Sequence, residues 1–444
     1  MRKLLGLGFG VLGFFLLGAL PAFAGGADNR LAQAVRGNDH AAIKRLLAAH
    51  ADVNAPLADK STVLAWAVDR QNVESVHMLL AAGAKPNVID IGGASPLTLA
   101  CELGNAEIVT SLLRAGANPN AARHDGIAAL AMCAGSSTPQ ALDALIAKGA
   151  KVEAVNPQGQ TALMWAAARG RTENMMFLLA HGANVNAVSQ GGFTPLFFAL
   201  RSKQPSAPLA LLDAGANSQS VLPDGTSVVA ASLANDNLSF AMTVVARGAD
   251  LAQRDSRGRQ LLHVAAASGQ ADLVELVLSK GVDANAMSEP PVQQVAGGTK
   301  PPPRPVSKPP LIFAAEAGSA PAMKALVNAG AKVSVKAQDG TTVALAAAGS
   351  GNLDAVKYAL QLDPDLTAIG SGHRSIMHYA IANKNPDLAI PVLQYLADKG
   401  AKLDVVNEKG DTPADFINRG GQQDIRIFYV QLLKDKGVAA SLNH

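Results

Sequence analysis

Large and charged side chains are scarce in this sequence of 444 residues, of which 4% are aromatic and 16% are charged. The chain therefore cannot build a core around many large rings. Its hydrophobic content of 49% is nevertheless too high for a disordered protein. Because alanine, leucine, valine and glycine dominate, the composition favours short helices that pack closely against one another.

The sequence also lacks any run of lysine and arginine interleaved with aromatic residues. Its formal net charge is only +3, and Arg2 and Lys3 near the N-terminus supply two of those charges. A nucleic-acid-binding protein normally carries a concentrated basic surface. We therefore expect no nucleic-acid partner.

Spaced motifs for catalysis or cofactor binding are absent as well. The nine histidines are dispersed, and no H-E-x-x-H, C-x-x-C or EF-hand spacing occurs. The glycine-rich segment Gly349-Ser350-Gly351 lies between two expected helices, whereas a phosphate-binding loop joins a strand to a helix. We predict no catalytic residue, no cofactor site and no metal site.

Residues 1–24 have the features of a secretory signal peptide. Two positive residues precede an apolar run from Leu4 to Leu20, and Ala22-Phe23-Ala24 is a small-x-small cleavage sequence. An uncleaved anchor is the alternative, although the run is short for a membrane span. We expect cleavage after Ala24, no membrane span thereafter, and a location in the periplasm or outside the cell.

A short glycine motif recurs along the rest of the chain, for example as AGANPN at 115–120 and HGANVN at 181–186. The first glycines of seven successive copies stand 33 residues apart, at Gly83, Gly116, Gly149, Gly182, Gly215, Gly248 and Gly281. A fixed period of this length indicates a solenoid, in which one short unit is stacked many times.

A second motif holds a constant distance from the first, as in SPLTLA at 95–100 and TPLFFA at 194–199. Its initial serine or threonine can cap a helix, and the proline that follows is tolerated in a first turn. A second apolar pattern follows, and the recurring glycine would end that second helix in a left-handed conformation. Each unit is therefore predicted to be a pair of short helices.

The second motif resembles the T-P-L-H-x-A signature of the ankyrin-repeat family. The resemblance implies an all-α solenoid of about twelve helix-turn-helix units with β-hairpin-like fingers, covering residues 25–436. The first unit, about 29–61, and the last, about 412–436, are polar enough to serve as caps, and 437–444 would be a flexible tail. Residues 288–310 are a proline-rich insertion in one finger, and they could be a tolerated loop or a functional flap or ligand.

Cys101 and Cys133 are 32 residues apart, which places them in neighbouring inner helices. A disulfide is conceivable in an oxidising compartment. However, helices packed 8–10 Å apart rarely bring two Cα atoms within about 6 Å. Both cysteines also stand where other units have small residues, so we expect buried free thiols.

The resemblance also implies a concave groove formed by the fingers and the inner helices. We expect partner-binding residues at finger positions, before the inner helix and at its end. They are Ile127, Gln158, Arg169, Phe193, Arg201, Arg257, Arg259 and Arg374. Because Gln158, Arg169, Phe193 and Arg201 should meet across adjacent units, we define these four as the central patch.

These observations predict a monomeric, non-catalytic scaffold that binds one or more proteins outside the cytoplasm. One alternative is a secreted effector that binds proteins of a host or competitor cell. Another is an enzyme whose site the sequence does not reveal. The family does not identify the partner, because ankyrin repeats bind many unrelated proteins.

Overall fold

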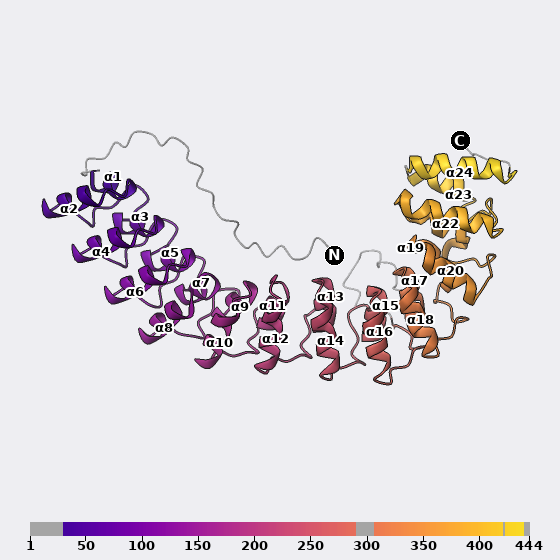
Figure 1. Ribbon diagram of the computed structural model, residues 1–444, viewed down its shortest axis with the longest axis horizontal. Coiled ribbons are helices and arrows are strands. Elements are labelled where there is room, and N and C mark those ends of the chain that lie inside the picture. The colour runs from indigo at the N-terminus through magenta and orange to yellow at the C-terminus, as the bar shows by residue number, and fades with distance from the viewer. Residues whose placement is uncertain (1–29, 290–305, 421, 439–444) are drawn as a thin grey trace, which may run out of the picture.

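The computed structural model describes residues 30–289, 306–420 and 422–438. These residues form 24 α-helices arranged as twelve consecutive pairs, which stack into a curved solenoid (Figure 1). No strand is present in the described part, although isolated β-bridges such as Ala122–Ala128 close some of the fingers. The predicted all-α solenoid of about twelve units is thus confirmed.

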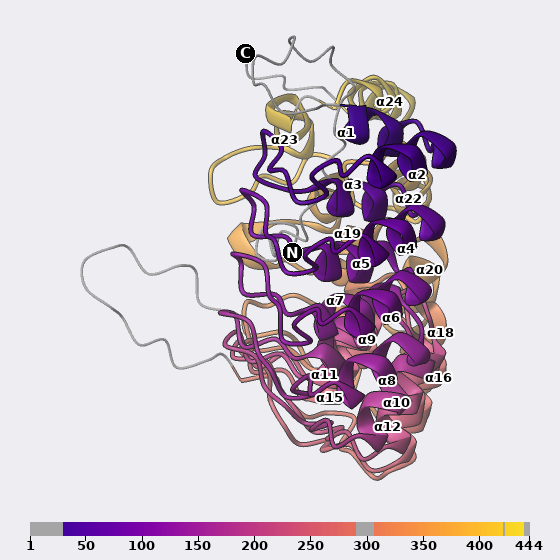
Figure 2. The same cartoon turned by 90° about the vertical axis from the view of Figure 1, so that its left-hand side faces the viewer.

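The odd-numbered helices form the inner row of the arc and the even-numbered helices the outer row (Figure 1). The inner helices are α1 (Arg30–Arg36), α3 (Val63–Asp69), α5 (Pro96–Leu103), α7 (Ala129–Ser136), α9 (Ala162–Ala168), α11 (Pro195–Leu200), α13 (Val228–Ala234), α15 (Leu261–Ser268), α17 (Pro310–Glu316), α19 (Val343–Ser350), α21 (Ile376–Ala382) and α23 (Pro413–Gly420). The outer helices are α2 (His40–Ala48), α4 (Val73–Ala81), α6 (Ala106–Arg114), α8 (Pro139–Ala147), α10 (Thr172–Ala180), α12 (Ser206–Asp213), α14 (Leu238–Ala246), α16 (Ala271–Leu278), α18 (Ala320–Asn328), α20 (Leu353–Leu362), α22 (Pro386–Asp398) and α24 (Gln423–Asp435). The fingers project together to one side of both rows (Figure 2), and a 3₁₀ turn, η1 (Ser371–His373), lies in one of them.

The fifth unit shows why the sequence folds in this way. The Thr161 hydroxyl accepts a hydrogen bond from the Met164 amide and caps α9. Gly170 and Gly182 then take φ values of 64° and 86°, which a side chain would disfavour, and so end the inner and outer helices. The inner helix α9 contacts the neighbouring inner helices α7 and α11 and its own outer helix α10. Its small side chains allow this close packing on three sides.

The apolar side chains of all twelve units form one continuous core. Most described residues of the inner helices are buried or half-buried, and every residue of α11 is covered. A single pair of helices could not bury its apolar residues in this way, so each unit depends on its neighbours.

A repeated hydrogen-bond pair joins the ends of successive outer helices. The Asn87 side chain donates to the Gly116 carbonyl at 3.0 Å and accepts from the Asn118 amide at 2.7 Å. Equivalent asparagines make the same two contacts at Asn54, Asn120, Asn186 and Asn285. We call this set the asparagine ladder.

The asparagine ladder keeps only one of its two contacts at Glu153, which accepts from the Asn184 amide, and it loses both contacts around the seventh unit, α13 with α14. Gln219 and Ala252 stand at the ladder positions there, and the described residues contain no equivalent bond to Gly248 or Gly281. The fingers of units five and six are joined by a bond from the Gln190 amide to the Gln158 carbonyl, 3.0 Å long. The residue equivalent to Gln190 one unit later is proline, which has no N–H.

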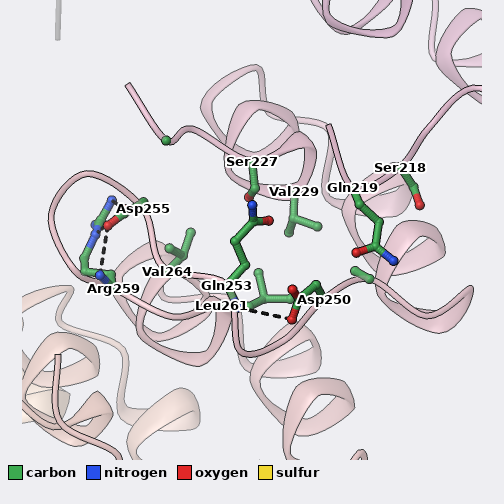
Figure 3. Close-up of a pocket in the computed structure, with 12 residues that line it drawn as sticks. Ser218, Gln219, Ser227, Val229, Asp250, Gln253, Asp255, Arg259, Leu261 and Val264 are labelled. Atoms are coloured by element: carbon green, nitrogen blue, oxygen red, sulfur yellow. Dashed lines mark hydrogen bonds and ion pairs between the residues drawn. The ribbon is translucent and has the colours of Figure 1, made fainter. Parts of the chain in front are cut away.

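A small cavity of about 20 Å³ also lies between the seventh and eighth units. Figure 3 shows Gln253 reaching across it toward Ser227, with the Asp255–Arg259 ion pair to one side. Its volume is close to the smallest that can hold a water molecule. The seventh unit is therefore joined to its neighbours by apolar packing and by a 2.7 Å ion pair between Arg247, which follows α14, and Asp213 at the end of α12.

The expectation of free thiols is wrong, because Cys101 and Cys133 form a disulfide between α5 and α7. Their Cα atoms are only 4.3 Å apart. The helices can approach this closely because residue 104 is glycine. A Cβ atom at that position would lie only 2.6 Å from the Ser136 carbonyl oxygen. The Ser137 hydroxyl reinforces this contact by donating to the Gly104 carbonyl at 3.1 Å.

Three predicted segments lie wholly or mainly outside the described residues. They are the signal peptide at 1–24, most of the proline-rich insertion and nearly all of the tail. These assignments stay predictions. Among the described residues, no helix is both long and apolar enough to cross a bilayer.

Candidate partner-binding site

The inner row carries a shallow depression near the middle of the solenoid. Ala168, Arg169, Phe198 and Arg201 line it. Arg169 directly follows α9 and Arg201 directly follows α11, so the two arginines come from equivalent ends of neighbouring inner helices. Both side chains are exposed.

The depression is connected to an aromatic cluster. The Phe193 ring is centred 6.3 Å from the Phe197 ring, in the edge-on geometry that aromatic pairs favour, and 6.0 Å from the Phe198 ring, to which it is tilted by 54°. Phe193 is half-buried and packs against the core. The structure therefore brings Arg169, Arg201 and Phe193 together around Phe198.

Neither Arg169 nor Arg201 has a hydrogen bond or ion pair from its guanidinium to any described residue. Other arginines near the fingers are neutralised locally. Arg123 pairs with Glu102 and Asp125, and Arg254 pairs with Glu289. The two cations in the depression are therefore available to a negatively charged ligand.

The remaining patch residues lie farther along the fingers. Gln158 is exposed at a finger tip, where its main-chain amide donates to the Asn156 side chain and its main-chain carbonyl accepts from the Gln190 amide. Ile127 is half-buried and packs against the core, as Phe193 does. Both apolar residues thus have a packing role besides any contact with a partner.

The other three predicted arginines have local roles in the fold. Arg259 forms a 2.7 Å ion pair with Asp255, and the two side chains are only 16% and 10% exposed. Arg374 lies 5.3 Å from the centre of the Tyr379 ring and donates to the Ser371 carbonyl at 2.8 Å. Arg257 is exposed on the finger that precedes α15 and is not among the residues that line the depression.

The two histidines of the T-P-L-H motif, His263 and His378, are buried, and both ring nitrogens of each form hydrogen bonds. The Nε2–H of His263 donates to the Ala286 carbonyl at 2.8 Å, and its Nδ1 accepts from the Gln260 amide at 3.2 Å. Burial lowers the pKa of His263 to about 4 and also lowers that of His378, which makes equivalent bonds. Both imidazoles are therefore neutral and already occupied.

The described residues contain no group of three or more His, Cys, Asp or Glu side chains that could hold a metal ion.

One set of exposed residues was not predicted from the sequence. Ile89, Val155, Val188 and Val221 are 49%, 58%, 63% and 39% exposed, and all stand six residues before the start of the second motif. A comparison of this one position across units would have revealed them. They give the fingers of these units an apolar edge.

The chain belongs to the ankyrin-repeat family. The family model described as ankyrin repeats (3 copies) matches residues 31–123, 129–220 and 311–407, and a single ankyrin repeat matches 257–289. These matches cover more than half of the chain. Residues 221–256 fall between them, and this gap coincides with the seventh unit and its interrupted asparagine ladder.

Curated relatives are similar over parts of the chain. The E3 ubiquitin-protein ligase KEG of Arabidopsis thaliana is 29% identical over 37% of this chain and 9% of its own length. Neurogenic locus notch homolog protein 1 of Danio rerio is 29% identical over 36% of this chain and 6% of its own length. Protein phosphatase 1 regulatory subunit 27 of Homo sapiens is 30% identical over 18% of this chain and 49% of its own length. The matched parts thus cover less than two thirds of each relative.

Proposed function

We propose that this protein is a non-catalytic scaffold that binds another protein through the concave side of its solenoid. Membership of the ankyrin-repeat family supports an interaction role. The observation that carries the proposal is the depression at Arg169 and Arg201, where two unpaired cations adjoin an aromatic cluster. Arginine and aromatic side chains are favoured anchors in protein interfaces.

We further propose that the scaffold acts as a monomer outside the cytoplasm, after cleavage of residues 1–24. The leader sequence supports export. The Cys101–Cys133 disulfide supports it independently, because disulfides persist mainly in oxidising compartments. Release as a secreted effector remains the alternative to retention in the periplasm.

Partner capture tests the interaction role. The full chain is compared with a variant carrying Arg169→Glu, Arg201→Glu and Phe193→Ala, after circular dichroism shows that both are folded. We expect the variant to lose a protein that is crosslinked to the wild type in the native cells. Capture of the same proteins by both chains would contradict the proposal.

Fractionation tests the export proposal. Protein from the cytoplasm, periplasm and medium is subjected to N-terminal sequencing, and its size is measured in solution. We expect a monomer that begins at Gly25 in the periplasm or the medium. An intact N-terminus in the cytoplasmic fraction would refute export without affecting the interaction role.

A further inference from the structure

The depression at Arg169 and Arg201 points to the chemistry of its ligand. We propose that it binds an acidic, extended segment of the partner, with one carboxylate at each arginine. This inference rests on the proposed scaffold function and adds the class of ligand.

The first argument is charge. Arg171 and Lys203 lie two residues after Arg169 and Arg201, so each of the two neighbouring helix ends carries two cations. The described residues provide no carboxylate partner for Arg169 or Arg201. A carboxylate placed there would replace water around both guanidinium groups with charge-assisted hydrogen bonds.

The second argument is the position of the Arg169 side chain. If Gly135 on α7 had a side chain, its Cβ would lie 3.5 Å from the Arg169 Cγ. The arginine stem thus runs over a glycine in the preceding unit. Because Gly135 has no side chain, it leaves room for the arginine stem beside α7.

The third argument is the apolar surroundings. Phe198 forms part of the wall, and Phe193 packs against it. The half-buried Phe193 ring can contact the aliphatic or aromatic residues that lie between two acidic residues. A nucleic acid would instead need a long basic track, which the sequence lacks.

The fourth argument is spacing. Arg169 and Arg201 belong to adjacent units, whose helices stack roughly 10 Å apart. A polyproline II segment has three residues per turn and a rise of about 3.1 Å per residue, so residues i and i+3 share a face about 9 Å apart. An acidic segment with glutamate at every third position therefore fits the pair.

Fluorescence anisotropy with a synthetic peptide tests this inference. The probe is a fluorescein-labelled peptide with glutamate at every third position between prolines and leucines, and its counterpart has glutamine at those positions. We expect the full chain to bind the glutamate peptide at least tenfold more tightly than the glutamine peptide. The affinity should fall at least tenfold in the variant Arg169→Gln, Arg201→Gln and should also fall with added salt.

The matched control is Arg114→Gln with Lys148→Gln. These exposed cations stand at the ends of α6 and α8, so they occupy adjacent units in the outer row and change the net charge equally. We expect this control variant to bind like the wild type. An equal loss in both variants would show that net charge, not the depression, attracts the peptide, and would overturn the inference.

Three further outcomes are decisive. Equal binding of the glutamate and glutamine peptides, or binding of neither, would overturn the acidic-ligand inference. The scaffold proposal would survive either of these peptide results if substitutions in the central patch still abolish capture of the native partner. Tighter, arginine-dependent binding of a fluorescein-labelled 15-nucleotide single-stranded DNA would overturn the assignment to a peptide.

Discussion

Removal of the Cys101–Cys133 disulfide should destabilise the third and fourth units. The bond closes a loop between residues 32 positions apart. The chain-entropy estimate for a loop of that length is about 4 kcal/mol of unfolding free energy. The variant Cys101→Ala, Cys133→Ala should lose most of this amount, because the alanines found in equivalent inner-helix positions limit the loss of packing.

Hydrogen exchange read by mass spectrometry is the suitable assay, since a solenoid can unfold in parts. We expect faster exchange in α5 to α8 of the double variant and little change in α17 to α24. Wild type treated with reductant under partly denaturing conditions should match the variant. The single variant Cys101→Ala should also match it, because either change removes the same covalent link.

Two results would refute this reasoning. A thiol assay on the unfolded, unreduced protein should find no free thiol, and two free thiols would show that the bond does not form. Equal exchange in the wild type and the double variant would show that the bond adds no stability to the close contact between α5 and α7.

Three other perturbations follow from the contacts described above. Burial lowers the pKa of His263 to about 4, so between about pH 6.5 and pH 4 the unfolded chain gains a proton that the folded chain does not. Stability should therefore fall by up to about 3 kcal/mol as the pH falls through this window. Urea unfolding at several pH values checks this, and a His263→Gln variant should show a smaller decrease. Asn186→Ala should cost about 1 kcal/mol, because water replaces the asparagine in two exposed hydrogen bonds, one to the Gly215 carbonyl and one from the Asn217 amide; an unchanged urea midpoint would contradict this. Conversely, Gln219→Asn with Ala252→Asn should restore the asparagine ladder and slow exchange in α13 and α14, and unchanged or faster exchange there would refute the proposed cause of the interruption.

The fold could be predicted well from the sequence because each unit repeats the residues that begin and end its helices. Glycines such as Gly170 and Gly182 occupy left-handed conformations that other residues disfavour, so their spacing marks the helix ends. The number of units followed from the same period. The exposed β-branched residues on the finger edge, such as Val155 and Val188, follow the same period. The sequence does not distinguish them from buried apolar residues, because only the folded chain shows that they are exposed.

The disulfide could not be predicted from an average helix separation. The usual distance assumes side chains between the helices, whereas Gly104 and the small residues of α7 allow the closer approach. Gly104 ends α5 with a φ of 78°, yet its effect on the helix separation depends on which atom of the next unit faces it. This contact belongs to the tertiary structure, so the sequence of a single unit does not reveal it.

The candidate site was predicted only in part for a similar reason. Equivalent positions in adjacent units correctly placed Arg169 beside Arg201. The packing of Phe193 on Phe197 and Phe198 depends on how the rings tilt in the folded chain. Arg259 pairs with Asp255, four residues earlier, and this local ion pair depends on a finger conformation that the repeat register alone does not specify.

Site-specific photocrosslinking in the native cells tests the role of the concave side most directly. A photoreactive benzoylphenylalanine replaces Ala168, which lines the depression, or Ala147, which ends the outer helix α8 and is exposed. Our account predicts one or a few discrete protein adducts from position 168 and none of these from position 147. The same adducts from both positions, or adducts from position 147 alone, would contradict it.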